Sequence, residues 1–256
     1  MTRDGGAIEG LPELPGFVEW FRFGETERVD AAVAMLERIG CRRLRTHVSW
    51  ADWHRPEGPD WYAWLLPLLA GRFELLPALH YTPPSLSETG AVNGPPREPK
   101  AFADFLDLLI DRHGALFDTV ELWNEPNNLL DWDWRVDPDW DKFADMVGGA
   151  GHWARRRGKR AVLGGPCPTD LKWLDIMGGH GVLAEMDVVS VHGFPGTWDS
   201  ESATWPGWED LVGDVRRAVH AWNPALAVWI TETGYSTWRH DDAGQIRRFL
   251  EAAAAP

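Results

Sequence analysis

The chain has 256 residues, of which 44% are hydrophobic, and its 39 acidic and 25 basic side chains give a formal net charge of −14. This length fits one domain, or a single α/β barrel, better than two independent units, and the apolar content excludes a disordered chain. The negative charge repels phosphate groups and anionic lipids, so nucleic acid and membranes are excluded as partners, and no stretch is long enough to span a bilayer.

Short apolar runs alternate along the chain with longer segments of helical period, which is typical of βαβ units and a parallel sheet. Each predicted strand is too short to be a helix and ends in polar or aromatic residues. In chain order the strands are Gly16–Arg22, Arg43–Ser49, Leu75–Tyr81, Thr119–Asn124, Ala161–Gly165, Val188–His192 and Ala227–Glu232. Residues 1–15 form an N-terminal extension, and residues 16–256 form one barrel domain.

Apolar side chains recur at helical spacing between the strands, which predicts helices that pack on the outer face of a barrel. They are Val29, Val33, Leu36 and Ile39, then Phe102, Phe105, Leu106 and Leu109, then Phe143, Met146 and Val147, and later Leu211, Val215 and Val219. The loops after the strands are long at residues 82–99, 126–138 and 193–208, whereas the helix-to-strand connections are short. This asymmetry is typical of a functional C-terminal face, so the fold class predicted is α/β, a TIM-type (β/α)8 barrel.

The eighth β/α unit of such a barrel is missing from the sequence pattern. After the seventh predicted strand only Asp241–Ala254 remains, and this segment has the pattern of one helix. Two interpretations stay open. In the first, the chain is a fragment of a longer one. In the second, the gap between the first and seventh strands is closed by a partner or by self-association, or it stays open with two exposed sheet edges.

Two glutamates follow predicted strands at the same face of the barrel. Glu125 comes at the end of the fourth strand, directly before Pro126, and Glu232 ends the seventh strand before a glycine-containing loop. Glu121 shares the orientation of Glu125 on an alternating strand, but only Glu125 lies at the mouth. Glycoside hydrolysis needs two carboxyl groups, one to protonate the leaving oxygen and one to meet the anomeric carbon. The pair therefore predicts a glycosidase.

The Asn-Glu-Pro motif on the fourth strand, together with a glutamate on the seventh, resembles glycoside hydrolase clan A, particularly families 39 and 5, over nearly the whole chain. The resemblance implies a retaining enzyme with Glu125 as acid/base and Glu232 as nucleophile. It further implies that Arg45 keeps the nucleophile ionised and that Asn124 donates a hydrogen bond to the sugar 2-hydroxyl. His80 and His192 match pocket residues of the clan.

The sequence departs from the clan pattern at two places. Where the clan commonly has a tyrosine two residues after the strand-six histidine, this chain has Phe194, which carries no hydroxyl. The aromatic residue of strand eight has no counterpart. For the acid/base residue itself, we expect burial and the nearby ionised Glu232 to keep Glu125 protonated.

The chain contains 17 tryptophans, and broad aromatic faces stack on sugar rings as well as fill cores. Trp50, Trp123 and Tyr235 are assigned to substrate binding. The wider set of platform candidates also includes Trp53, Trp132, Trp134, Trp198 and Trp238. Each of them has packing as its alternative role.

No cofactor and no metal are predicted, because the sequence contains neither an HExxH motif nor a carboxylate cluster with ligand spacing. Cys41 and Cys167 lack paired spacing, and the N-terminus has no apolar signal region, so we expect a cytoplasmic protein.

The leading hypothesis is a retaining β-glycosidase that acts on a small soluble glycoside or oligosaccharide, with β-xylosides suggested by the resemblance to family 39. The alternative is a non-catalytic or vestigial carbohydrate-binding barrel that belongs to a larger carbohydrate-processing protein.

Overall fold

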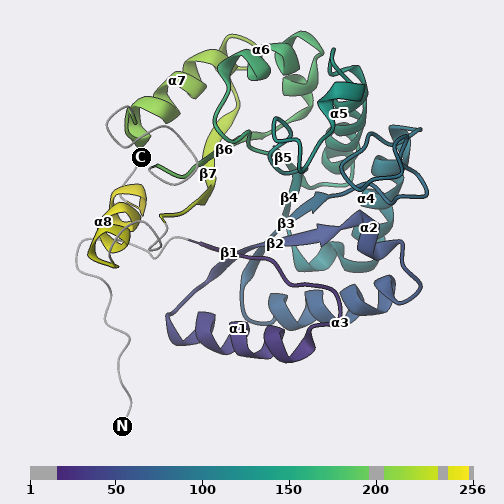
Figure 1. Cartoon of the computed structure of the whole chain (residues 1–256), viewed down its shortest axis with the longest axis vertical. Helices are drawn as coiled ribbons and strands as arrows, with labels where there is room; N and C mark the ends of the chain where they lie inside the picture. The colour runs from purple at the N-terminus through teal and green to yellow at the C-terminus, as the bar shows by residue number, and fades with distance from the viewer. Residues whose placement is uncertain (1–15, 196–204, 236–241, 254–256) are drawn as a thin grey trace.

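The computed structural model describes residues 16–195, 205–235 and 242–253 (Figure 1). The N-terminal extension and two of the platform candidates, Trp198 and Trp238, lie outside the described residues.

Seven parallel strands form a nearly closed barrel in which neighbours in sequence are neighbours in space (Figure 1). The strands are β1 Phe17–Glu19, β2 Arg43–Ser49, β3 Glu74–His80, β4 Thr119–Leu122, β5 Arg160–Leu163, β6 Val188–Gly193 and β7 Ala227–Thr233. All seven predicted strands are confirmed. The first is shorter than predicted because residues 20–23 leave the sheet and line a cavity.

Helices follow the strands and cover the outer face of the barrel, as predicted. They are α1 Thr26–Arg38, α2 Trp50–Trp53, α3 Gly58–Ala70, α4 Lys100–His113, α5 Asp141–Arg156, α6 Leu171–Gly179, α7 Trp208–His220 and α8 Asp242–Ala253. The stripes on α1, α4, α5 and α7 are largely buried. The apolar pattern did not reveal α3, because leucine and tryptophan occupy most of its circumference and leave no separate stripe.

The eighth unit is absent from the described residues, and β1 pairs only with β2 while β7 pairs only with β6. Helix α8 lies on this side of the barrel, beside β1 (Figure 1). The rings of Phe249 on α8 and Phe17 on β1 are stacked with centroids 6.3 Å apart. Gln245 donates a hydrogen bond of 2.7 Å to the carbonyl of Tyr235, just after β7. Helix α8 therefore contacts both edges of the gap.

None of the helices within the described ranges is long and apolar enough to cross a membrane.

Candidate active site

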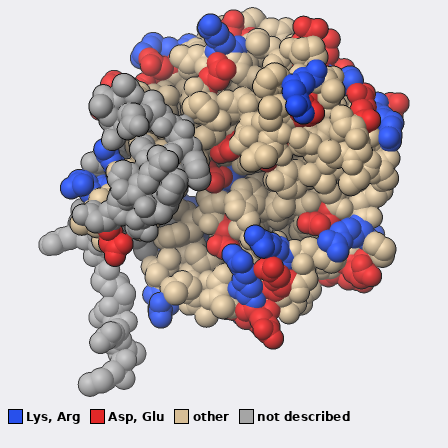
Figure 2. All heavy atoms as spheres, in the orientation of Figure 1, with Lys and Arg blue, Asp and Glu red and all other residues tan. Residues whose placement is uncertain are grey.

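A cavity of about 530 Å³ opens where the strands end. Its walls come from residues 20–25 after β1, from β2 and the α2 region, from the end of β3, and from the segments after β4 and at the end of β7. Figure 2 shows this hollow from outside, with acidic side chains in red near its centre. In a parallel barrel the carboxyl ends of all strands meet at one face, which explains why distant segments share one cavity.

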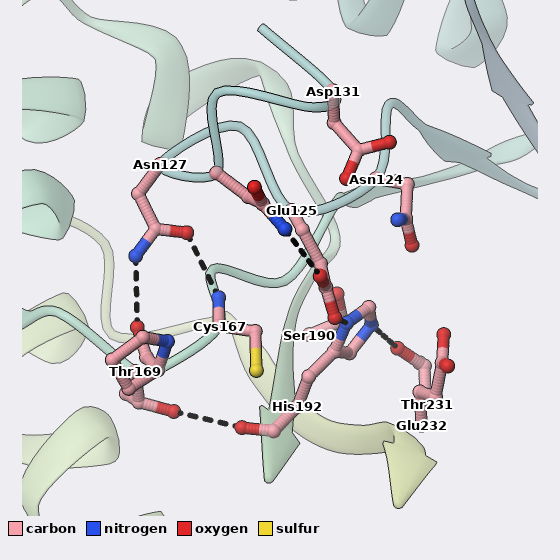
Figure 3. A network of polar contacts seen from close by, with 12 residues as sticks. Asn124, Glu125, Asn127, Asp131, Cys167, Thr169, Ser190, His192, Thr231 and Glu232 are labelled. Atoms are coloured by element: carbon pink, nitrogen blue, oxygen red, sulfur yellow. Dashed lines mark hydrogen bonds and ion pairs between the residues drawn. The ribbon is translucent and has the colours of Figure 1, made fainter. Parts of the chain in front are cut away.

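The two predicted carboxylates come together in this cavity. Glu125 follows β4 and has a backbone φ of 35°, and Glu232 lies in β7. A carboxylate oxygen of Glu125, a ring nitrogen of His192 and a carboxylate oxygen of Glu232 all lie within 4.8 Å of one another (Figure 3). Both glutamate side chains are mostly buried, with exposed fractions of 15% and 18%.

Arg45 on β2 holds three side chains at once and is itself almost fully buried. Its Nη1 donates to Glu232 at 2.7 Å, its Nη2 donates to Oδ1 of Asn124 at 2.8 Å, and its Nε donates to Glu121 at 2.5 Å. Because Asn124 accepts through its oxygen, its amide N–H groups are directed away from Arg45. Arg45 thus brings Asn124, Glu121 and Glu232 together, while the roles that the resemblance implies for Arg45 and Asn124 stay predictions.

His192 on β6 stands between Glu125 and the strand β7. Its Nδ1 lies 3.1 Å from Oε1 of Glu125 and its Nε2 lies 3.0 Å from the hydroxyl of Thr231 (Figure 3). Burial disfavours the charged imidazole, but hydrogen bonds to Glu121 and Glu125 outweigh burial and raise the pKa of His192.

The expectation of a protonated Glu125 is wrong in this structure. Burial raises its pKa, but the hydrogen bond and charge of His192 and a hydrogen bond from Asn128 outweigh burial and hold the pKa of Glu125 below its usual value. The difference comes from His192, which lies 67 residues from Glu125 in the sequence and meets it only in the folded chain. The two groups interact directly, so Glu125 and His192 titrate as a pair.

His80 lines the cavity at the end of β3 and is buried. Its Nε2 lies 3.1 Å from Asp131. Burial and the charge of Arg45 lower the pKa of His80 to about 3, so the imidazole is neutral at ordinary pH.

Several cavity residues were not predicted from the sequence, among them Asp131, His47, Tyr81 and Trp20. Burial and the charge of Glu125 raise the pKa of Asp131 to about 7. Trp20 meets the ring of His47 edge-on and lies under the Arg45 guanidinium, 5.1 Å from the ring centroid. Trp20 could have been predicted, because it stands near the end of a predicted strand. Asp131 could not, because nothing in the sequence distinguishes it from other acidic loop residues.

The assignment of Trp50 and Trp123 to substrate binding is corrected, because both are core residues. Trp50 is 3% exposed and packs against Phe102 and Phe105. Trp123 has no exposed surface and donates its Nε1 hydrogen bond to the carbonyl of Asp131 at 3.0 Å. A sugar platform needs an open face, which neither ring has.

The remaining aromatic candidates within the described ranges do not line the cavity either. Trp53 and Trp132 are buried, and Trp134 is 38% exposed on the loop after β4. Tyr235 contacts α8, where the Arg248 guanidinium lies 5.7 Å from its ring centroid. Phe194, which stands where the clan commonly has a tyrosine, lies close to Gly234.

Glu125, His192 and Glu232 are also the side chains that could hold a metal ion among the residues described. The same carboxylates already have cationic or N–H partners, since Arg45 binds Glu232 and His192 faces Glu125. A divalent cation would have to share this space with the guanidinium, whose like charge repels it.

Comparisons with known proteins identify the fold. No family model matches the chain, and no curated protein matches it in sequence. Among solved structures, β-mannanase from Thermomonospora fusca in a mannohexaose complex is 16% identical, with 95% of this chain and 76% of that chain covered and a TM-score of 0.55. A second structure of this β-mannanase is 15% identical, with 92% of this chain and 76% of that chain covered and a TM-score of 0.53. Deoxyribose phosphate aldolase from Aeropyrum pernix is 11% identical, with 94% and 81% covered and a TM-score of 0.52.

These likenesses establish a TIM-type barrel of the kind that β-mannanase has, in agreement with the resemblance to TIM-barrel glycosidases drawn from the sequence. A hydrolase and an aldolase both share the fold, so the function must be argued from the site.

Proposed function

We propose that this chain is a retaining β-glycosidase that cleaves O-glycosidic bonds by double displacement. The observation that carries the proposal is the approach of Glu125 and Glu232, which have carboxylate oxygens within 4.8 Å of each other. Retaining enzymes hold their two carboxyl groups about 5–5.5 Å apart, whereas inverting enzymes need about 6.5–9.5 Å for an intervening water. The short separation favours retention.

In the first step Glu232, held by Arg45, attacks the anomeric carbon and forms a bond to it. The bond from this carbon to the leaving oxygen breaks with its electron pair, and the oxygen takes a proton from Glu125. The hydrogen-bonded pair of Glu125 and His192 supplies this proton. In the second step Glu125 accepts a proton from water, whose oxygen displaces Glu232 and releases the sugar with its original configuration.

The substrate proposed is a small soluble glycoside or oligosaccharide. β-Xylosides are suggested by the resemblance to family 39, and β-mannosides by the fold shared with β-mannanase. We also propose that the protein works inside the cell, since its two cysteines lack disulfide spacing. Self-association at the gap between β1 and β7 stays a prediction.

The test is hydrolysis of nitrophenyl β-xyloside, β-mannoside and β-glucoside by the wild type and by Glu125→Ala and Glu232→Ala. We expect hydrolysis of at least one glycoside, loss of turnover in both variants, and a product that has the β configuration when first formed, as seen by proton NMR. Normal turnover by Glu232→Ala contradicts the nucleophile assignment, and an α product contradicts retention.

The alternative is a carbohydrate-binding or vestigial barrel. Two features favour it: Phe194 carries no hydroxyl, and the described residues form no eighth strand. Calorimetric titration with mannotriose and xylobiose separates the two. Sugar binding by a wild type that hydrolyses no glycoside supports the alternative.

A further inference from the structure

A buried carboxylate, Glu121 on β4, lies below the two carboxylates proposed for catalysis and touches neither of them in any described contact. Three other strands supply its partners. Arg45 on β2 donates to Oε2 at 2.5 Å, and Ser190 on β6 and Thr231 on β7 donate to Oε1 at 2.8 and 3.0 Å. Alternate strands of a TIM barrel normally fill this interior layer with branched apolar side chains. A charged group at this place is therefore unusual.

The charge state of Glu121 is fixed by these partners. Burial raises its pKa, but the charge of Arg45 and the contact with His192 outweigh burial and lower the pKa of Glu121 to about 2. An ionised carboxylate accepts hydrogen bonds and donates none. The single hydroxyl proton of Thr231 is therefore donated to Glu121.

The direction of this hydrogen bond decides the tautomer of the histidine above it. Because the Thr231 proton is used on Glu121, the Thr231 oxygen accepts, and Nε2 of His192, 3.0 Å away, must carry the hydrogen that it donates. Nδ1 of His192 is then the nitrogen that exchanges a proton with Glu125, 3.1 Å away.

Glu121 is linked to Glu232 through Arg45. A guanidinium presents its donors in a fixed fork, so the Nε hydrogen bond to Glu121 orients the Nη1 donor that holds Glu232. One buried carboxylate is thus linked to Glu125 through Thr231 and His192, and to Glu232 through Arg45.

We propose that Glu121 is a positioning residue for both carboxylates: it sets the His192 tautomer that faces Glu125, and it orients the guanidinium that holds Glu232. The roles of Glu125 and Glu232 in this inference rest on the proposed function, whereas the Glu121 to His192 link does not.

The sharpest variant is Thr231→Val, which removes the hydroxyl, keeps the side-chain shape, and leaves the ion pair of Arg45 with Glu121 in place. Thr231→Ser restores the hydroxyl. The matched control is Thr46→Val, since Thr46 is also buried on a strand but bonds the carbonyl of Glu19, outside these contacts. Glu121→Gln, which removes the charge itself, completes the set.

Nitrogen-15 NMR of the histidine side chains gives a readout that does not need activity. At a pH above the titration of His192, the wild type and Thr231→Ser should show the neutral ring with hydrogen on Nε2, and Thr231→Val should gain the Nδ1 tautomer. The pKa of His192 should be lower in Glu121→Gln. The other charged or titratable groups that face His192 are Glu125, Asp131, Arg45 and Glu232, and all of them remain in these variants.

Glycoside hydrolysis gives the second readout. Loss of alignment at the reacting atoms should lower kcat by about tenfold or more in Thr231→Val and Glu121→Gln, with KM within about threefold of the wild type. The alkaline limb of the kcat/KM profile should move to lower pH, because the shared proton of Glu125 and His192 is held less tightly. Thr231→Ser should recover most of kcat, and Thr46→Val should change none of these quantities.

The outcomes separate this inference from the proposed function. Unchanged His192 tautomer and kcat in Thr231→Val overturn the inference even in an active enzyme, and they do so whether or not Glu121→Gln folds. A wild type that hydrolyses no glycoside, but whose His192 tautomer changes in Thr231→Val, contradicts the proposed function and leaves the Glu121 to His192 link standing.

Discussion

Nδ1 of His192 lies 3.1 Å from Oε1 of Glu125, and the His192 ring has no exposed surface. This contact reverses the protonation expected for Glu125 from burial, since it lowers the pKa of that carboxyl. It also means that any proton transferred to a leaving group belongs to the pair of residues rather than to Glu125 alone.

Replacing His192 by Asn should raise the pKa of Glu125, because burial then dominates over the two opposing effects that remain, the hydrogen bond from Asn128 and the charge of Arg45. The measurement is a carbon-13 NMR titration of glutamate carboxyls, with Glu125→Gln to identify the Glu125 resonance. A Glu125 titration midpoint that stays the same, or falls, contradicts the role given to His192.

Replacing Asp131 by Asn should change how stability depends on pH. Unfolded aspartate titrates near pH 3.9, whereas burial and the charge of Glu125 raise the pKa of folded Asp131 to about 7. Between these values the folded state keeps a proton that the unfolded state has lost, so the Asp131 contribution to the free energy of unfolding falls as pH rises. Relative to the wild type, Asp131→Asn should gain stability across this window, by up to about 4 kcal/mol.

Urea unfolding between pH 4.5 and 8 measures this difference. Asp133→Asn is the control, because its carboxyl pairs with Arg135 and that contact lowers its pKa, so its effect should be constant over the same range. A constant stability difference for Asp131→Asn would show that Asp131 is ionised throughout.

Replacing Arg45 by Ala should cost about 3–5 kcal/mol of unfolding free energy, because it leaves the fully buried Glu121 charge unpaired. Arg43→Ala on the same strand is the control. Its guanidinium is exposed and pairs with Glu74 at 3.3 Å, so its loss should cost about 0–1 kcal/mol. Equal midpoints in urea for the two variants would argue against a buried ionic layer.

Trp20, rather than Trp50, should contribute to sugar binding. Trp20→Ala should raise KM by about threefold to tenfold, the size of one stacking contact, with little change in stability. Trp50→Ala should instead cost about 3–5 kcal/mol of stability and leave the KM of the folded protein unchanged. Steady-state kinetics and urea unfolding of both variants decide this, and a raised KM for Trp50→Ala alone would reverse the assignment.

Several features of the fold follow directly from local sequence. The predicted bounds of β2, Arg43–Ser49, are those of the structure, because a strand of this length between a glycine turn and an aromatic segment has a clear local pattern. Helix α3 shows the opposite case. It packs against α2, α4 and β3, so burial in the complete fold, not helical spacing, accounts for its apolar residues.

Some residues of the candidate site could likewise be predicted from local sequence, and others could not. Glu125 and Glu232 could be identified because each stands at the end of an apolar strand, a relationship contained in a few neighbouring residues. Trp50 and Trp123 were misassigned because a tryptophan at a strand end packs inward or faces the cavity according to which helix lies behind it.

The sequence by itself determined the order of the β/α units and the two carboxylates at the C-terminal face, since periodicity and strand-end motifs are local. Only the tertiary structure decided which groups meet those carboxylates. Arg45 and Glu121 are 76 residues apart, and their contact depends on the register and closure of the barrel. The protonation of Glu125 and the tautomer of His192 follow from such contacts, because a buried charge responds to neighbours within a few ångströms and not to its position along the chain.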